Sequence, residues 1–495
     1  MKKIAVIGSG FSGLAAATCL AHHGYDVTVL EKNSSAGGRA RKFEAEGFTF
    51  DMGPSWYWMP DVFEKYFALF GKKPSDYYEL DRLSPSYRIY FGRNDFLDIP
   101  AGVDALCAMF DQLEPGSSRK LLQFLDEGRY KYEIGINDLV YKPGLSVSEL
   151  IDPKLFAGVF KLHVFQSISQ YVRKFFKEPR LIQLLEFPVL FLGATAQKTP
   201  ALYSLMNYAD MALGTWYPKG GMHKVVEGMT RLAQEKGVHF EFNSEVTRFN
   251  LNQNSIQDVM VNGTPRAFDY VVAGADYHHV EQTLLPASHR RYSETYWQNR
   301  DMAPSSLIFY LGLNKKLNGM LHHTLFFDED FGNHAREIYE NPQWPTAPQF
   351  YVSCPSQTDP TVAPPGCENI FILIPVAPGL TDTPEIRERY YNLVMPRFEA
   401  LLGQSIREHV VYKRSYAHAD FQADYHAFKG NAYGLANTIK QTANLKPSIL
   451  NKKVRNLFYT GQLTVPGPGV PPSLISGQVV AAQLMKQDER AKVSV

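Results

Sequence analysis

The sequence is poor in cysteine. Its 495 residues include only Cys19, Cys107, Cys354 and Cys367, with no CxxC motif and no metal-ligand spacing among them. Domains held together by disulfides or structural zinc need a denser and more regular cysteine pattern. We therefore expect a cytoplasmic protein in a reducing compartment, with no disulfide framework and no metal site.

An excess of charge of either sign is also missing. The chain carries 51 Lys and Arg against 50 Asp and Glu, a formal net charge of +1. Nucleic-acid affinity comes largely from positive charge that neutralises phosphates. The balance therefore argues against a nucleic acid as partner.

Long apolar runs are absent as well. One of the longest is residues 371–378, far below the roughly 20 residues that a membrane-spanning helix needs. The N-terminus starts with two lysines, as signal peptides do, but Gly8 and Gly10 interrupt its apolar stretch at once. We expect a protein that touches a membrane at most and does not cross it.

Aromatic residues are the abundant feature. The chain has 32 Phe, 28 Tyr and 5 Trp, which together make up 13% of its residues. Flat apolar side chains suit a site for a large apolar molecule, and they also suit an ordinary core. Composition alone leaves both uses open.

The first 31 residues predict a strand, a helix and a second strand. The apolar residues 4–7 precede Gly8, Gly10 and Gly13, a helix follows, and the second strand ends at Glu31. In a dinucleotide-binding unit these glycines allow a tight turn, close approach to a pyrophosphate, and helix–strand packing, while the acidic residue accepts ribose hydroxyls. The order of these elements predicts a bound dinucleotide.

A second glycine pair distinguishes between FAD and NAD. Gly37, Gly38 and Arg39 follow soon after Glu31, and this arrangement resembles the extended fingerprint of the amine-oxidase-like flavoproteins. Glycines permit close backbone approach, and an arginine offers a cationic fork to phosphate or flavin oxygens. We therefore expect FAD.

Further segments make the whole chain resemble the bacterial-type phytoene desaturases, which are FAD-dependent carotenoid desaturases of the flavin amine oxidase superfamily. The matching segments are residues 50–54, 218–222, 456–461 and 466–471. One departure is Lys446 before Pro447, where the family commonly has arginine. Lysine keeps the charge but loses the bidentate fork.

The resemblance implies an α/β fold of the amine oxidase and GDI type, with a Rossmann-type FAD-binding domain and a discontinuous substrate domain. The FAD-binding domain is expected in residues 1–80, 215–300 and 415–495. Residues 81–214 are expected to be a mainly helical region facing substrate and membrane, and residues 301–414 the mixed, largely antiparallel sheet of the substrate domain.

The resemblance also implies the cofactor contacts. Phosphate contacts fall near the glycine loop, the ribose contact at Glu31, the adenine contact at Val246, and the flavin contacts in the C-terminal turn. The expected cofactor-binding residues are Gly8, Gly10, Ser12, Gly13, Glu31, Lys32, Gly37, Gly38, Arg39, Gly53, Pro54, Val246, Gly461, Gly469 and Val470.

The implied reaction is the introduction of conjugated double bonds into phytoene or partly desaturated carotenes, with oxygen or a quinone as electron acceptor. Related alternatives are a hydroxycarotenoid 3,4-desaturase, a carotenoid isomerase and a carotenoid oxidase, since these relatives share the motifs. More distant alternatives are an amine oxidase and a non-enzymatic prenyl-lipid carrier. The complete glycine set with Glu31 and Arg39 argues against the carrier.

The sequence identifies no catalytic acid or base. Residues 56–58 and 216–217 are aromatic candidates for the walls of a substrate tunnel, although core packing is the stronger interpretation for each. The pairs at 278–279 and 322–323 are read as surface or loop histidines rather than metal ligands.

A basic amphipathic helix is predicted over residues 161–177, and Glu149 is read as the capping residue of a box that begins at Ser146. Such a helix is typical of membrane-surface binding, and equally of a helix packed on the core. With a hydrocarbon substrate, the former predicts a cytoplasmic protein attached to the inner face of the cell membrane.

Overall fold

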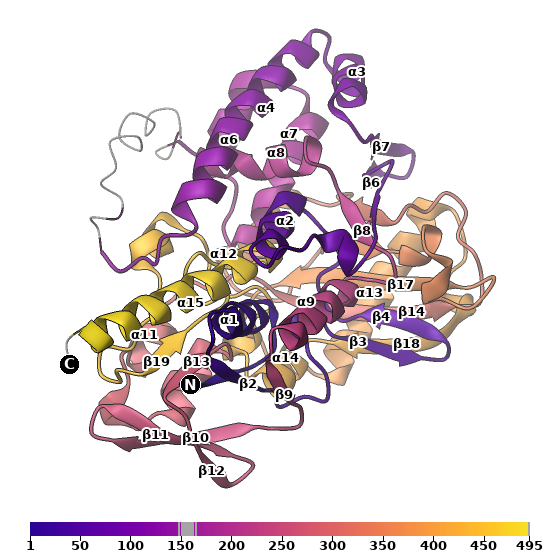
Figure 1. The fold of residues 1–495 in the computed structure, drawn as a ribbon. Helices are drawn as coiled ribbons and strands as arrows, with labels where there is room; N and C mark the ends of the chain where they lie inside the picture. The colour runs from indigo at the N-terminus through magenta and orange to yellow at the C-terminus, as the bar shows by residue number, and fades with distance from the viewer. Residues whose placement is uncertain (147–148, 150–162, 164–165, 494–495) are drawn as a thin grey trace.

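The computed structural model describes residues 1–146, 149, 163 and 166–493. Its architecture is α/β, with one parallel sheet, one large mixed sheet and a group of helices above them (Figure 1). The predicted fold class is confirmed by this arrangement.

The parallel sheet contains the predicted N-terminal unit. Its strand order is β19-β13-β1-β2-β9, and every pair in it is parallel. The strands are β1 (Lys3–Ile7), β2 (Asp26–Leu30), β9 (His239–Glu241), β13 (Tyr270–Ala273) and β19 (Leu457–Tyr459). Helix α1 (Phe11–His22) connects β1 to β2, so the predicted strand, helix and strand form a βαβ crossover.

The alternation along β1 explains how this sheet is buried on both faces. Ile4 and Val6 pack with α1, α9 (His223–Glu235) and α15 (Val470–Val493). Ala5 and Ile7 pack on the opposite face with a three-stranded meander. The meander consists of β10 (Val246–Asn252), β11 (Ser255–Val261) and β12 (Thr264–Ala267). Successive strand residues point to opposite faces, which is why a continuous apolar run suits this position.

The larger sheet has seven strands in the order β18-β14-β17-β16-β15-β6-β7. All its pairs are antiparallel except β15 with β6, which agrees with the mixed, largely antiparallel sheet expected for the substrate domain. The strands are β6 (Tyr87–Gly92), β7 (Asp95–Ile99), β14 (Ser305–Leu313), β15 (His323–Phe326), β16 (Phe350–Ser353), β17 (Glu368–Val376) and β18 (Val410–Tyr416).

Strand β14 is buried along its whole length, and its two faces have different neighbours. Leu307, Phe309 and Leu311 belong to the cluster that packs against α13 (Pro384–Leu402). Ile308 and Tyr310 point the other way, into the cluster that the helices above the sheet complete. The inner face of this sheet therefore lies under the helical region.

The helical region is formed by α3 (Val103–Leu113), α4 (Ser117–Ile134), α6 (Ile168–Phe175), α7 (Pro179–Glu186) and α8 (Leu205–Met211), at the top of Figure 1. All of them fall within the range 81–214. That range also contains β6 and β7, which join the large sheet because their apolar residues Tyr87, Ile89 and Ile99 are buried against it.

Only part of the predicted helix over 161–177 can be compared with the structure. Residues 161–162 and 164–165 lie outside the described residues. The helix α6 begins at Ile168, where the Ser167 hydroxyl accepts from the Gln170 N–H as an N-cap, and it ends at Phe175, so the predicted helix is too long at both of its described ends. The Glu149 carboxylate accepts hydrogen bonds from the backbone N–H groups of Gly144, Leu145 and Ser146. The Ser146 bond is the one that a capping box requires of its acidic residue.

The remaining elements are short or peripheral. They are α2 (Pro60–Ala68), α10 (Tyr277–His279), α11 (Glu294–Gln298), α12 (Phe331–Tyr339), α14 (His418–Tyr425), β3 (Lys42–Ala45), β4 (Phe48–Asp51), β5 (Leu80–Arg82) and β8 (Trp216–Pro218). Among the described residues, no helix combines the length and the apolar character that crossing a bilayer demands.

Candidate functional site

A cavity of about 730 Å³ extends from the glycine loop after β1 to the inner face of the large sheet. It brings together segments that lie far apart in the sequence. Of the predicted cofactor residues it is lined by Gly8, Gly10, Ser12, Glu31, Lys32, Gly37, Gly38, Arg39, Gly53, Pro54, Val246, Gly461, Gly469 and Val470. Gly13 is the predicted residue that does not line it.

The three glycines of the first loop have different physical roles. Gly8 adopts a left-handed φ of 90°, and its N–H donates to the carbonyl of Leu30 over 2.9 Å. A Cβ at Gly13 would collide with the carbonyl oxygen of Gly8, whereas a Cβ at Gly10 would have no atom within 4 Å. Gly13 therefore packs helix against strand, and Gly10 leaves open space at the start of α1.

Glu31 is buried, at 4% exposure, and its carboxylate is held from two sides. One oxygen accepts from the Ser9 N–H over 2.9 Å and from the Ser9 hydroxyl over 2.7 Å. The other accepts from the Asn33 backbone and side-chain N–H groups, each over 2.9 Å. A buried carboxylate needs such partners, and these fix its place beside the glycine loop.

The second glycine pair lies directly on the first loop. The Gly37 N–H donates to the carbonyl of Ser9 over 2.9 Å, and a Cβ at Gly38 would lie 3.3 Å from the Cα of Gly10. A Cβ at Gly53 would lie 2.7 Å from the Arg39 carbonyl oxygen. Close backbone approach is thus the reason for glycine at these positions.

Arg39 is a half-buried cation whose guanidinium lacks a full set of partners among the described residues. Its Nη2 donates to the carbonyl of Asn431 over 3.1 Å, its guanidinium lies 5.0 Å from the ring centre of Tyr425, and its Nε has no partner among the described residues. Burial lowers the pKa of Arg39, and the nearby Asp276 carboxylate opposes that shift. An orphaned cationic donor beside a cavity favours an anionic or carbonyl-bearing ligand.

Lys32 and Val246 line the cavity as well. Lys32 Nζ donates to the carbonyl of Ala423 over 2.7 Å. Val246 begins β10, and the preceding Ser244 N–H donates to the Glu31 carbonyl over 2.8 Å. The start of the meander is therefore fixed against the end of β2.

The C-terminal turn completes the cavity between β19 and α15. Gly461 and Gly469 have left-handed φ values of 109° and 111°, and the Gly461 N–H donates to the Ser476 hydroxyl over 3.0 Å. Val470 is the first residue of α15, so the turn passes directly into the closing helix. A Cβ at Gly477 would collide with the carbonyl of Ser12, so α15 packs closely on α1.

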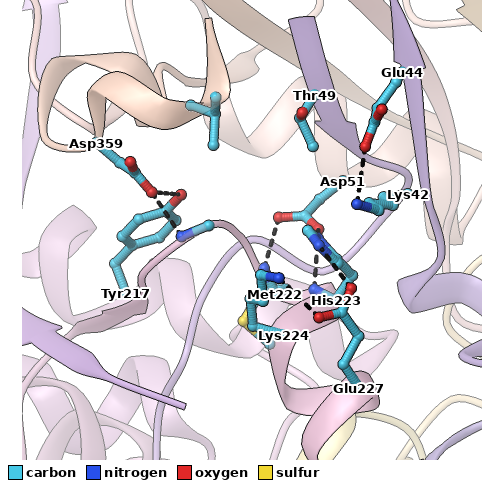
Figure 2. A network of polar contacts seen from close by, with 12 residues as sticks. Lys42, Glu44, Thr49, Asp51, Tyr217, Met222, His223, Lys224, Glu227 and Asp359 are labelled. Carbon is cyan, nitrogen blue, oxygen red and sulfur yellow. Dashed lines mark hydrogen bonds and ion pairs between the residues drawn. The ribbon is translucent and has the colours of Figure 1, made fainter.

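Two of the segments that carry the family resemblance, residues 50–54 and 218–222, contact one another through Asp51 (Figure 2). Its carboxylate accepts from the backbone N–H groups of Met222 over 2.7 Å and His223 over 3.1 Å, at the start of α9. A Cβ at Gly221 would lie 2.6 Å from the same carboxylate. The acidic side chain satisfies the N-terminal donors of a helix, and the glycine makes room for it.

The comparisons with known proteins agree with this geometry. The family model described as flavin containing amine oxidoreductase matches residues 11–485. A carotenoid 3,4-desaturase of Haloarcula japonica is 40% identical over 484 residues, which are 98% of each chain. A zeta-carotene-forming phytoene desaturase of Myxococcus xanthus is 32% identical, over 98% of this chain and 94% of that one.

The chain belongs to the carotenoid desaturase family of flavin-containing amine oxidoreductases. An oxidoreductase from Methanosarcina mazei has the same fold, with a TM-score of 0.63 at 14% identity over 97% of this chain and 100% of that one. The predicted family, fold and enzyme class are therefore confirmed. As a member of this family the protein is an FAD-dependent oxidoreductase.

The residues present fit this cofactor. The first turn of α1 has no acidic residue and no side-chain cap, so its N–H groups remain available for a pyrophosphate. Open space at Gly10 and the orphaned Arg39 Nε lie along the same cavity. Together these features suit a long ligand that carries negative charge at the α1 N-terminus and hydrogen-bond acceptors along its length.

In this desaturase family member, the aromatic candidates divide into two groups. Trp56 and Trp58 line the cavity. Tyr57 is a core residue stacked on Phe63 at 4.5 Å, and Tyr217 donates its hydroxyl to Asp359 over 3.1 Å. Trp216 likewise does not line the cavity, and its indole N–H donates to the carbonyl of Leu213.

The surface interpretation of His322 and His323 is wrong. Both are buried, at 4% and 0% exposure. His323 begins β15, which lies between two other strands of the large sheet, and His322 directly precedes it. His323 stacks on Trp56 at 4.2 Å, and burial keeps its pKa well below the usual value. No group of three or more metal-ligating side chains occurs among the described residues.

Several residues that line the cavity were not predicted, among them Asp276, Tyr351, Tyr425 and Tyr433. His279, expected as a surface or loop residue, lines the cavity as well. A signal existed for Asp276. It follows β13 closely, and β13 is the parallel neighbour of β1, so the carboxyl ends of these strands meet at one edge of the sheet. The others depend on tertiary packing alone.

Proposed function

We propose that the protein introduces conjugated double bonds into phytoene or partly desaturated carotenes in carotenoid biosynthesis. The observation that carries this proposal is the continuity of one cavity from the glycine loop to a chamber with apolar walls. Those walls include Met52, Trp56, Trp58, Ile136, Leu205, Met206, Ile308 and Leu373. The named activities of the two desaturase relatives support the same reaction class.

For the cofactor, we assign the phosphates to Gly8, Gly10, Ser12 and the α1 N-terminus that Gly13 holds in place. Glu31 takes the ribose, and Lys32 and Val246 lie at the adenosine end. Gly37, Gly38, Arg39, Gly53 and Pro54 form the middle of the site, and Gly461, Gly469 and Val470 form the flavin end. Spectral titration with FAD tests this set.

When bound, FAD supplies a two-electron acceptor, so that a carbon–carbon single bond can become a double bond. The chain orients the substrate and excludes water. Trp56 and Trp58 present aromatic rings beside Ile308, and such faces tolerate positive charge that develops on a hydrocarbon. We assign no catalytic acid or base. Oxygen or a quinone is the proposed final electron acceptor.

A second candidate is desaturation of a carotenoid that already carries oxygen. The 3,4-desaturase relative has the higher identity of the two, and hydroxyl-bearing side chains line the cavity, among them Ser55, Ser306, Tyr351 and Tyr433. Ser55 and Tyr351 lie 2.9 Å apart at their hydroxyls, and the Ser306 hydroxyl has no hydrogen-bond partner among the described residues. Such groups can bind an alcohol that phytoene lacks.

We also propose attachment to the inner face of the cell membrane, at the edge of the cavity where residues 142–145 meet residues 443–445. Gly144 and Asn444 line the cavity, and a Cβ at Gly144 would lie 3.8 Å from the Cα of Asn444. Beside them, Leu145 and Leu445 are 39% and 57% exposed. Exposed leucines at a cavity edge give an insoluble substrate a route of entry.

The reaction is tested with FAD-loaded protein and phytoene in liposomes, by following the absorption spectrum. We expect longer-wavelength polyene bands to appear. Ile308→Trp should abolish them while FAD absorbance persists, because it fills the chamber. Val411→Trp, at an exposed position of the same sheet, is the matched control. If phytoene stays unchanged but a hydroxylated carotene is desaturated, the second candidate replaces the first.

Flotation with acidic lipid vesicles tests membrane attachment. We expect the wild type to co-float and the double variant Leu145→Asp, Leu445→Asp to remain below. Leu122→Asp, at a leucine 51% exposed on α4, is the matched control. A second variant reverses the charges of Arg173, Lys174 and Lys177, and an effect of that variant alone would move the contact to the α6 region. If the wild type does not float, attachment is excluded.

A further inference from the structure

A lysine buried near the flavin end of the cavity has no partner. Lys446 is 4% exposed, and its Nζ has no hydrogen-bond partner among the described residues. The side-chain oxygen of Asn437, a residue 7% exposed, has none either. Both atoms meet Gly467, where a Cβ would lie 3.1 Å from Lys446 Nζ and 3.0 Å from Asn437 Oδ1.

This pair adjoins the cavity at the start of α15. Asn437, Pro466 and Pro468 line the cavity, and Gly467 lies three residues before the first residue of the helix. The N-terminus of a helix carries partial positive charge, and the first turn of α15 contains no acidic residue. An ammonium and a helix N-terminus therefore meet at one loop without a carboxylate between them.

The charged groups on the neighbouring segment are already occupied. The neighbouring residues 142–146 pack on residues 443–444 and on Val465 through Gly144. Lys142 Nζ donates to the carbonyl of Glu149 over 2.5 Å, and the Glu149 carboxylate accepts three backbone N–H groups. Burial lowers the pKa of Lys446 to about 7, and no described ionisable group contributes to that shift. A nearby anion would raise it again.

We propose that Lys446 is the counter-charge of the reduced cofactor: its amine is neutral while FAD is oxidised, and it takes up one proton from solvent when FAD is reduced. Two electrons and one proton reduce the flavin and add one negative charge to it. A second proton, taken from solvent, forms an N–H bond on Lys446. No bond in the substrate is broken for this step. The ammonium then cancels the added charge, and Asn437 Oδ1 can accept its N–H.

The test is a reductive titration of FAD-loaded protein against a redox dye, without any carotenoid. If the reduction of FAD takes up one proton per two electrons, the ratio of reduced to oxidised FAD at a fixed dye potential falls about tenfold per pH unit. This corresponds to a decrease of about 30 mV in the reduction potential of FAD. With two protons the ratio falls about a hundredfold. We expect the hundredfold dependence in the wild type above about pH 7 and the tenfold dependence in Lys446→Met.

Lys446→Arg sharpens the test because arginine stays charged throughout this pH range. It should show the tenfold dependence and favour reduced FAD at high pH relative to Lys446→Met. Lys131→Met is the matched control. Burial lowers the pKa of Lys131 to about 8, but its Nζ donates to Ser204 over 3.0 Å, whereas Lys446 Nζ has no partner among the described residues and lies at Gly467, between the cavity-lining residues Pro466 and Pro468.

A tenfold dependence in the wild type overturns the proposal, and so does its appearance in Lys131→Met. If Lys446→Met does not fold, Lys446→Arg decides alone. Since the titration contains no carotenoid, its outcome is independent of the desaturase assay, and either proposal can fail without the other.

Discussion

The two ends of the cavity are built on opposite principles. At the glycine-loop end, the protein satisfies the buried carboxylate of Glu31 with four hydrogen bonds of its own. At the other end, buried polar atoms of Asn437, Thr438, Asn444 and Lys446 have no partner among the described residues.

The difference concerns what each end must do. A rigid end can hold an unchanging part of a cofactor, because its shape is fixed before binding. Unpaired buried polar groups destabilise the folded protein. This cost is offset only when a ligand supplies charge or hydrogen-bonding partners. Variants that change the packing, the charge or the hydrogen bonds at either end test this difference.

The largest effect is expected from Gly13→Ala. The added methyl collides with the Gly8 carbonyl, and overpacking of this kind costs about 1–3 kcal/mol or more. Thermal unfolding in excess FAD should show a lower midpoint, with reduced soluble yield. Gly10→Ala is the matched control, since its methyl meets open space. It should keep the unfolding midpoint of the flavin-free protein and lose at least tenfold in FAD affinity. Equal stability losses would contradict the separation of roles.

Lys446→Met should stabilise the protein in a pH-dependent way. The folded-state pKa of Lys446 is about 7 and its ordinary value 10.5, so the unfolded chain binds the extra proton between these values. The penalty is complete below pH 7 and fades as the pH rises toward 10.5. Denaturant unfolding with oxidised FAD at pH 6 and pH 9.5 should show a gain of a few kcal/mol at pH 6 and a smaller one at pH 9.5. A gain that grows with pH would refute this account.

Glu31→Gln should cost about 1–3 kcal/mol of unfolding free energy, because the new amide donor faces groups that themselves donate. Urea unfolding measures this loss. Glu245→Gln, at a partly exposed carboxylate, serves as the comparison. If the Glu31 variant is as stable as wild type, the rigidity assigned to this end is wrong.

The smallest effect on stability is expected from Ser306→Ala, within about 1 kcal/mol. Its effect should appear in substrate choice instead. If the chamber takes an oxygen-bearing carotenoid, the preference for that substrate over the hydrocarbon should fall roughly three- to tenfold. Competition between the two substrates, followed by chromatography, measures the ratio. An unchanged ratio would remove Ser306 from the specificity argument.

Local sequence patterns were sufficient to predict the glycine-loop end. Gly8, Gly13 and Glu31 belong to one βαβ unit, so their spacing along the chain determines their spacing in space. Strand β14 is also predictable from the local sequence, because its continuous apolar run indicates a buried strand. The resemblance extended this to the Asp51 and Gly221 motifs, although their mutual contact emerged only in the structure.

The other end could not be predicted in this way. Lys446 has no partner among the described residues because of where residues 437–446 pack, and no periodicity encodes that. His322 and His323, at the start of β15, were misread for a related reason: a short strand gives no indication of whether other strands flank it.

The packing of α1 against α15 has a consequence for the order of events during synthesis. The glycine loop at Gly8 is made 453 residues before Gly461, which helps to close the cavity together with Val470. Domains tend to fold as units as the chain emerges. Here β1 must wait for β13 and then β19, so a nascent chain cannot complete the cofactor site until the residues through Val470 have left the ribosome.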